Sequence, residues 1–155
     1  MNPRVILICG KICSGKSHLA REMAEKEKAV ILSVDEITTL YGPDLGDRHD
    51  IVTRRVQEYL CRKAREILAC GVPVILDWGF WNQGMRAFAR QALAGLPLEW
   101  HYLDISDGLW QSRIEKRNAH PGPADYTVDA GLKQKCLDLF EAPSPGEIDV
   151  WHTVG

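Results

Sequence analysis

The stretch VILICGKICSGKSH, which runs from Val5 to His18, decides the fold of this chain. Its first part, Val5–Cys9, is almost wholly apolar, as expected for a strand buried on both faces. Its second part, Gly10–Ser17, matches G-x-x-x-x-G-K-[ST] in full, between that predicted strand and a predicted helix. In such a loop, main-chain N–H groups point inward and form an anion-binding nest at the positive end of the helix dipole. The pattern predicts a phosphate-binding loop (P-loop).

The residues of this loop have separate predicted roles. Gly10 and Gly15 allow a close backbone approach and φ angles that a Cβ would hinder. Lys16 is expected to reach the β- and γ-phosphates of ATP, or alternatively GTP, while the Ser17 hydroxyl ligates Mg²⁺. The predicted nucleotide-binding residues are Gly10, Lys11, Ile12, Cys13, Ser14, Gly15, Lys16, Ser17 and His18.

A carboxylate closes the apolar run Val74–Leu76. In an open α/β sheet, a carboxylate at the carboxyl end of a strand beside the P-loop can hold Mg²⁺ or its water shell. We therefore predict Asp77 as a metal ligand together with Ser17. An ordinary turn aspartate before Trp78 is the alternative interpretation.

A second carboxylate, Asp35, follows the predicted strand Ala29–Leu32. From this edge of the sheet it can accept a proton from an attacking hydroxyl, so Asp35 is the predicted general base and Glu36 the second candidate. Ser33 and Glu36 also have the spacing of a helix capping box, in which Asp35 favours the first turn. The two interpretations are compatible.

Arg113 and Arg117 are four residues apart, so one helix face carries both guanidinium groups. They are predicted to stabilise the charge of a transferring phosphoryl group, on a lid at about residues 106–126 that includes the glycine- and proline-rich segment 120–123. A solvated basic face paired with Glu115 is the alternative. On the acceptor side, Arg48 and Arg54 are candidates for an anionic group and Trp78 for stacking. Solvated arginines are an equally open interpretation of Arg48 and Arg54, and packing in the core is the commoner use of a residue such as Trp78.

Composition narrows the class of protein. A chain of 155 residues has the usual size of one domain, so we expect a single domain over residues 1–155. A net charge of −2 gives no overall basic field for a nucleic-acid backbone, although a local basic patch stays open. No window approaches the roughly 20 apolar residues that cross a bilayer. Five cysteines without a CxxC pair favour reduced thiols in the cytoplasm.

Short apolar runs alternate with helical patterns, which predicts an α/β fold with a parallel sheet. The predicted strands are Val5–Cys9, Ala29–Leu32, Val74–Asp77, Leu98–Leu103 and Ile148–Trp151. The strongest helical pattern spans Ile51–Ala69 and ends at the predicted cap Gly71. Further helices are predicted after the P-loop and at residues 85–93, 109–117 and 129–140.

With these motifs the chain resembles the small P-loop kinases grouped as AAA-type ATPase-like or zeta-toxin-like kinases. That group is similar to polynucleotide 5′-hydroxyl kinases, gluconate kinases and chloramphenicol phosphotransferases. The matching segments are Gly10–Ser17, Ser33–Glu36, Leu76–Trp81, Arg113–Asn118 and Leu139–Pro143.

The resemblance implies a P-loop NTPase fold, with a five-stranded parallel sheet in the order 2-3-1-4-5, helices on both faces and a short lid after the fourth strand. It also implies Asp35 as the base and Arg113 and Arg117 as lid arginines. The polynucleotide kinases of the group carry a basic residue soon after the catalytic aspartate. Here the segment Ile37–Leu40 follows, which disfavours a phosphorylated nucleic-acid acceptor.

Together these features predict an ATP-dependent phosphotransferase that moves the γ-phosphoryl group to a hydroxyl of a small molecule. The rival within the class is a kinase of nucleic-acid ends or of a nucleotide-sugar. The rival outside it is a nucleotide-binding switch that hydrolyses ATP slowly and has no acceptor.

Overall fold

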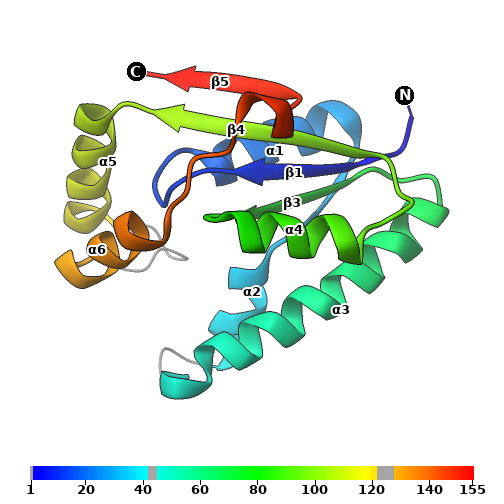
Figure 1. Cartoon of the computed structure of the whole chain (residues 1–155), viewed down its shortest axis with the longest axis horizontal. Helices are drawn as coiled ribbons and strands as arrows, with labels where there is room; N and C mark the ends of the chain where they lie inside the picture. Colours follow the sequence, from blue (N-terminus) through cyan, green and yellow to red (C-terminus); the bar gives the residue numbers. More distant parts are fainter. Residues whose placement is uncertain (1, 42–44, 122–127) are drawn as a thin grey trace.

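The computed structural model describes residues 2–41, 45–121 and 128–155. Its strands form one sheet in the order β2-β3-β1-β4-β5, and each neighbouring pair is parallel (Figure 1). The strands are β1 Val5–Cys9, β2 Val30–Leu32, β3 Val74–Gly79, β4 Leu98–Ile105 and β5 Val150–Val154. This order and direction confirm the predicted P-loop NTPase fold.

Helices cover both faces of the sheet. The α-helices are α1 Lys16–Glu27, α2 Val34–Thr38, α3 His49–Ala69, α4 Gln83–Ala92, α5 Asp107–Ala119 and α6 Ala130–Leu139. Helix α1 packs on one face through Ala20, and α3 and α4 pack on the other through Ala64 and Ala89. Short 3₁₀ segments, η1 Thr39–Tyr41, η2 Gly46–Arg48 and η3 Pro145–Glu147, complete the described elements. None of the helices is both long and apolar enough to be a candidate membrane span in the part of the chain that the structure describes.

The central strand β1 explains why the sheet holds together. All five of its residues are 0% exposed, and its side chains alternate between the two helical layers. Each buried Val, Ile or Leu contributes about 1.5–3 kcal/mol relative to an exposed one. Because all strands are parallel, their carboxyl ends meet at one edge of the sheet, where α5 and α6 also lie (Figure 1).

Two local predictions were wrong. The last strand begins at Val150 rather than Ile148, because Ile148 packs against the main hydrophobic core instead. The capping box at Ser33 does not form: Ser33 is the N-cap of α2, but its side chain makes no capping hydrogen bond. This short helix is held by its buried residues Val34 and Thr38. Gly71, with φ 82°, does follow the end of α3 as predicted.

A chain of polar side chains crosses the α1 side of the sheet. His101 Nε2 lies 2.7 Å from Glu99 Oε1, and His101 Nδ1 lies 2.9 Å from His152 Nε2. Arg4 donates to Glu99 over 2.7 Å and pairs with Glu27 at 2.8 Å. A nitrogen–nitrogen hydrogen bond needs one donor and one acceptor. The histidine pair therefore accommodates one imidazolium but not two.

This pair predicts acid sensitivity of the fold. Burial, with a smaller effect of His101, lowers the pKa of His152, so the unfolded chain binds this proton more tightly. Stability therefore falls as the pH drops through the unfolded pKa of about 6.5. In His152→Gln the loss of urea midpoint between about pH 7.5 and 5.5 should be smaller than in the wild type, measured by circular dichroism. His18→Gln, which replaces an exposed histidine on α1, should keep the wild-type loss. An unchanged loss in His152→Gln would contradict this assignment.

Candidate active site

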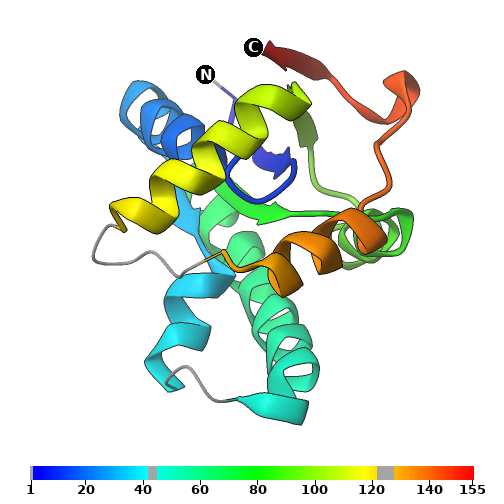
Figure 2. The same cartoon turned by 90° about the vertical axis from the view of Figure 1, so that its left-hand side faces the viewer.

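The P-loop lies between β1 and α1 at the carboxyl edge of the sheet, with α5 and α6 beside it (Figure 2). Gly15 has φ 103°, a left-handed conformation that residues with a Cβ rarely adopt. At Gly10 the constraint is contact: an added Cβ would lie 2.7 Å from Oγ of Ser14. Cys13 also has a positive φ, 58°, which the sequence pattern did not predict. The loop is therefore held in a tight, strained path.

Lys16 points back into this loop. Its Nζ donates to the carbonyl oxygens of Lys11 at 2.7 Å and Gly10 at 3.2 Å. Burial lowers the pKa of Lys16, and the nearby carboxylates of Asp77 and Asp35 act in the opposite direction. A half-buried ammonium with two neutral acceptors is well placed to receive a polyanion, because added negative charge compensates its lost hydration.

Asp77 lies at an irregularity in β3. Leu7 pairs with Leu76 and Cys9 pairs with Gly79, so β3 contains one more residue than β1 across this interval. An extra residue of this kind bends a strand and re-aims its side chains, and it is common beside active sites. Burial raises the pKa of Asp77 to about 6. Lys16 acts to lower it, while the charges of Asp35 and Glu36 add to the increase. The structure thus brings together the predicted carboxylates and Lys16.

Asp35 and Glu36 are both exposed on the first turn of α2. The charge of Asp35 raises the pKa of Asp77 more than the charge of Glu36 does. A cation bound at Asp77 would offset the repulsion from Asp35 and Glu36, which adds to the effect of burial on the pKa of Asp77. Ser17, on the first turn of α1, is exposed and adds a hydroxyl oxygen. These donors fit a hard divalent cation that takes its other ligands from phosphate and water.

Helix α5 brings both predicted lid arginines to the P-loop. Arg113 Nη1 donates to the carbonyl oxygen of Ser14 at 3.0 Å, and Arg117 Nη1 donates to Sγ of Cys13 at 3.2 Å. The alternative pairing with Glu115 is not seen in the described contacts, where Gln111 donates to that carboxylate. Both arginines therefore contact the loop. Residues 122–126 of the predicted lid, and Gly122 and Pro123 of its flap, lie outside the described residues.

Aromatic contacts behind the loop were missed in the sequence. Trp110 Nε1 donates to the carbonyl oxygen of Ile12 at 2.6 Å, and Nζ of Lys11 lies 4.8 Å from the centroid of the Trp110 ring. Lys11 also lies 5.5 Å from the Phe140 ring centroid. Trp110 is three residues before Arg113 on α5, so helical spacing next to the predicted arginines was the available signal. Of the other predicted loop residues, His18 is exposed and pairs with Glu22 at 2.9 Å.

The three acceptor-side candidates do not gather at one point. Arg54 lies 3.9 Å from the centroid of Phe88, so it joins α3 to α4. Trp78 stacks on Phe80 and its Nε1 donates to Leu32 O at 2.8 Å. Arg48 is exposed just before α3. These contacts account for two of the three side chains by packing, and a role in acceptor binding stays a prediction.

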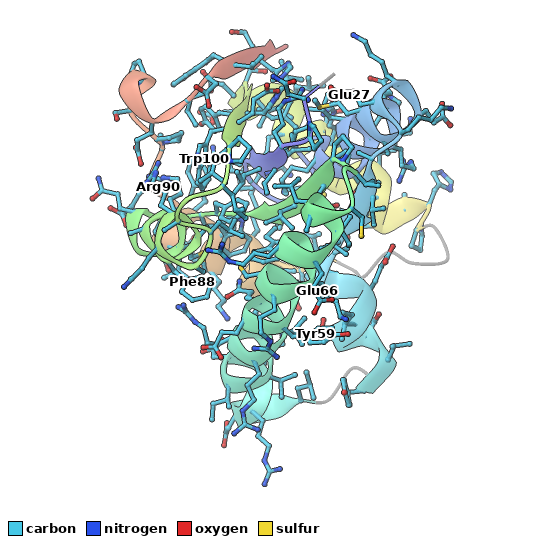
Figure 3. The ribbon with its side chains drawn as sticks, turned by 90° about the vertical axis from the view of Figure 1, so that its right-hand side faces the viewer. Glu27, Tyr59, Glu66, Phe88, Arg90 and Trp100 are labelled. Carbon is cyan, nitrogen blue, oxygen red and sulfur yellow. The ribbon has the colours of Figure 1, made fainter. Side chains whose placement is uncertain are left out.

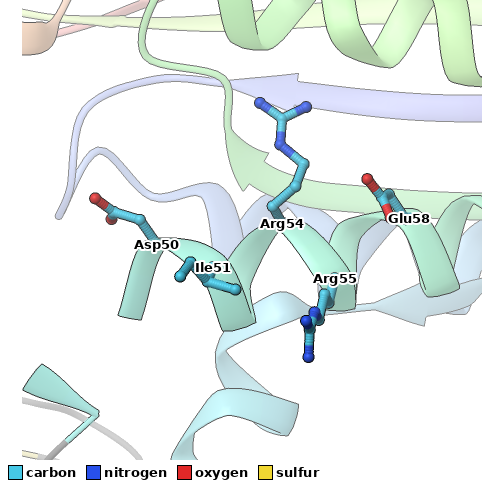
Figure 4. A pocket seen from close by; sticks show the side chains of 5 residues that line it. All are labelled: Asp50, Ile51, Arg54, Arg55 and Glu58. Carbon is cyan, nitrogen blue, oxygen red and sulfur yellow. The ribbon is translucent and has the colours of Figure 1, made fainter. Parts of the chain in front are cut away.

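Two hollows lie near α3, and neither contains the P-loop. Figure 4 shows one of about 520 Å³, where Arg54 and Arg55 point in opposite directions from the helix. The other, about 440 Å³, runs between α2 and α3 and includes Ile37. Residues 35 and 37 are about 200° apart around a helix, so this groove opens away from Asp35. Neither hollow is therefore assigned to the predicted nucleotide site, which includes the P-loop.

The fold and the loop define a protein of the P-loop NTPase class. A profile of the family described as "AAA domain" matches residues 5–143, and the chain belongs to this family. The resemblance to small P-loop kinases that was drawn from the sequence is confirmed.

Three solved structures illustrate the likeness. A sugar kinase from Janibacter sp. HTCC2649 has a TM-score of 0.69 at 21% identity, covering 97% of this chain and 85% of that one. A gluconokinase from Sinorhizobium meliloti 1021 has a TM-score of 0.63 at 22% identity, covering 99% and 83%. The APS kinase of Mycobacterium tuberculosis, solved with AMPPNP and APS, has a TM-score of 0.72 at 21% identity, covering 98% and 88%. At these identities the likeness establishes the fold.

The backbone of the P-loop predicts opposite effects for two glycine substitutions. Gly15→Ala should lower the free energy of unfolding by about 1–2 kcal/mol, because a left-handed φ is unfavourable for alanine. Gly108→Ala should raise it by up to about 1 kcal/mol, since Gly108 lies in the first turn of α5 with no atom within 4 Å of its added Cβ. Urea unfolding measures both. Equal effects of the two substitutions would contradict the loop geometry.

Proposed function

We propose that this protein is a kinase that transfers the γ-phosphoryl group of ATP to a hydroxyl group of a small-molecule acceptor. The observation that carries the proposal is the convergence of three kinds of group on one loop. Lys16 supplies a cation from the loop itself, and α5 supplies two arginines. Asp77 of β3 and Asp35 of α2 supply carboxylates. Each kind has a distinct task in phosphoryl transfer.

Donor binding rests on the P-loop. The inward-facing loop and the first turn of α1 offer main-chain N–H groups to the phosphates, and Lys16 reaches the same oxygens by leaving the carbonyls of Gly10 and Lys11. Ser17 and Asp77 are the residues that would hold Mg²⁺, which when bound neutralises charge between the β- and γ-phosphates. In the part of the chain that the structure describes, no three His, Cys, Asp or Glu side chains gather as a metal site. That fits an ion held largely by the nucleotide and water.

Transfer rests on Asp35 and the two arginines. Asp35 accepts the proton of the attacking hydroxyl while α5 offers Arg113 and Arg117 to the charge that spreads over the transferring group. Interactions that strengthen only as this charge develops raise the rate without tightening ATP binding. An acceptor without a phosphate group is supported by the acidic first turn of α2, where Asp35 and Glu36 would repel a phosphorylated one.

The donor site is tested by Lys16→Ala. The substitution removes a charged hydrogen-bond donor to phosphate worth about 1.5–3 kcal/mol, so calorimetry should show Mg·ATP binding weakened roughly 10- to 100-fold. Lys26→Ala, which removes an exposed lysine from the last turn of α1, is the matched control and should bind as the wild type does. Equal Mg·ATP affinity in all three proteins would remove the basis for the nucleotide assignment.

The acceptor side is tested by Asp35→Asn. A panel of sugars, sugar acids and other hydroxyl compounds is first incubated with ATP and MgCl₂, and phosphorylated products are identified by mass spectrometry. With the acceptor so found, Asp35→Asn should transfer about 10²- to 10⁴-fold more slowly, the range for loss of general-base catalysis. Its Mg·ATP affinity should stay near the wild-type value, because Asp35 serves the acceptor.

Glu36→Gln is the control, since it removes the adjacent exposed carboxylate of the same helix turn. If Glu36→Gln is slowed and Asp35→Asn is not, the base is Glu36. If only phosphate is released from ATP and no compound is phosphorylated, the protein is a slow hydrolase and the kinase proposal fails.

A further inference from the structure

A buried arginine lies outside the proposed catalytic groups. Arg86, on the first turns of α4, is 0% exposed and is the largest fully buried side chain among the described residues. Burying a guanidinium group is unfavourable unless its hydrogen bonds and charge are satisfied. Its partners therefore indicate what it is there to hold.

Arg86 joins α4 to two other segments of the chain. Its Nη1 donates to the carbonyl oxygens of Phe80 and Glu141, both at 3.0 Å, and its Nε donates to Oε1 of Glu147 at 3.1 Å. Burial acts to raise the pKa of Glu147, but hydrogen bonds from the Ser144 N–H and from Arg86 outweigh it and hold the pKa at about 2. The pair is thus charged at neutral pH. Phe80 follows β3, while Glu141 and Glu147 lie between α6 and β5.

Neighbouring side chains on α4 reinforce this ion pair. Arg90, one helical turn after Arg86, also donates to Oε1 of Glu147 at 3.1 Å. Its guanidinium lies 4.8 Å from the centroid of Trp100, and the two side chains are neighbours in Figure 3. Two arginines of α4 therefore donate hydrogen bonds to Glu147, and these bonds attach the segment after α6 to α4.

The turn that Arg86 holds is strained. Gly79 has φ 87° and Phe80 has φ 48°, so two consecutive residues are left-handed, and Phe80 carries a Cβ. The surroundings must impose this conformation. Hydrogen bonds to three successive carbonyl oxygens impose it. Gly79 O accepts from Gly10 N at 2.9 Å, and Phe80 O accepts from Arg86. Trp81 O accepts from Glu141 N at 2.6 Å.

This turn is connected directly to the proposed donor site. Gly79 comes two residues after Asp77, and Gly10 opens the P-loop. The bond between Gly10 N and Gly79 O therefore sets the distance between the loop and the end of β3. Arg86 holds the middle carbonyl of the turn and, through Glu141, the segment on its other side. The tail segment Leu139–Pro143, which matched the kinase group in the sequence, thus has a physical task at the site.

We propose that Arg86 is a positioning residue, which holds the end of β3, the P-loop and the segment after α6 in one arrangement so that Asp77 meets the metal–nucleotide complex. This inference rests on the proposed function, since it assigns Asp77 to that complex. Because Arg86 is fully buried, it acts through the carbonyl of Phe80 and not by direct contact with a ligand.

Arg86→Lys tests the inference. Lysine keeps the charge that faces Glu147, but it lacks the planar fork that reaches both carbonyls and the carboxylate together. The first readout needs no ligand: hydrogen exchange at the amides of Gly10 and Glu141, which donate to the turn, should be about 10-fold faster than in the wild type. The amide of Val5, which donates to Pro97 O at the opposite edge of the sheet, should be unchanged.

The second readout is calorimetry with AMPPNP, in MgCl₂ and in EDTA. In Arg86→Lys the gain in affinity that Mg²⁺ confers should fall about 10-fold, as expected when a support of a metal ligand is lost. Leu98→Ala is the control for general destabilisation, because Leu98 is a partly buried residue that packs against the core at the amino end of β4, far from the site.

The outcomes separate the two proposals. If exchange at Gly10 and Glu141 is unchanged in Arg86→Lys, or if Leu98→Ala reduces the Mg²⁺-dependent gain as much, the positioning role is wrong. If the wild type binds no AMPPNP, the proposed kinase function fails. In that case the exchange rates of the Gly10 and Glu141 amides still decide whether Arg86 holds the turn. The assignment of Asp77 to a metal–nucleotide complex is then overturned.

Discussion

The ammonium group of Lys16 is the charge around which the rest of the site is arranged. It lies where β1 passes into α1, and burial makes its charged form less favourable. Moving such a charge out of water costs several kcal/mol unless polar partners replace its hydration. The carbonyls of Gly10 and Lys11 provide part of that replacement, and Asp77 provides negative charge nearby. The strained conformation of the loop directs both carbonyl oxygens toward Nζ of Lys16.

The sheet order makes this arrangement possible. In the order β2-β3-β1-β4-β5, β3 lies beside β1, so the carboxylate at the end of β3 is next to the P-loop. The extra residue in β3 between Leu76 and Gly79 turns the strand at Asp77 itself. Asp35 reaches the same edge from β2, one strand further out, which matches a role on the acceptor rather than the donor. Strand order thus separates the two proposed tasks of the carboxylates.

Local patterns in the sequence predicted the parts of the site that depend on local chemistry. The P-loop, the strand Val5–Cys9, the helix ending before Gly71 and the shared face of Arg113 and Arg117 follow from spacing within about a dozen residues. The left-handed Phe80 and the buried Arg86 did not follow, because each depends on partners more than 50 residues away, such as Glu141 and Glu147.

Capping shows the same limit in a small case. Ser33 and Glu36 have the capping-box spacing but make no such bonds, whereas Ser144 and Glu147 have the same spacing and do form the box. The difference lies in the surroundings, since Glu147 is also held by Arg86 and Arg90 from α4. A motif of two residues acquires its geometry from the element that packs against it. The sequence at Ser33 carries no sign of that missing support.

The cationic side chains of the site already donate hydrogen bonds to protein acceptors. These bonds limit the free energy that a bound phosphate can gain. Lys16 donates to two loop carbonyls, Arg113 to Ser14 O and Arg117 to Cys13 Sγ. A phosphate that binds exchanges these contacts for stronger charged ones, so affinity reflects the difference and not the sum of the new bonds. The same contacts hold the arginine side chains beside the loop in advance, which lowers the cost of ordering them. In the proposed reaction, the site therefore gives up part of its ground-state affinity and keeps its arginines close to where charge would develop during transfer.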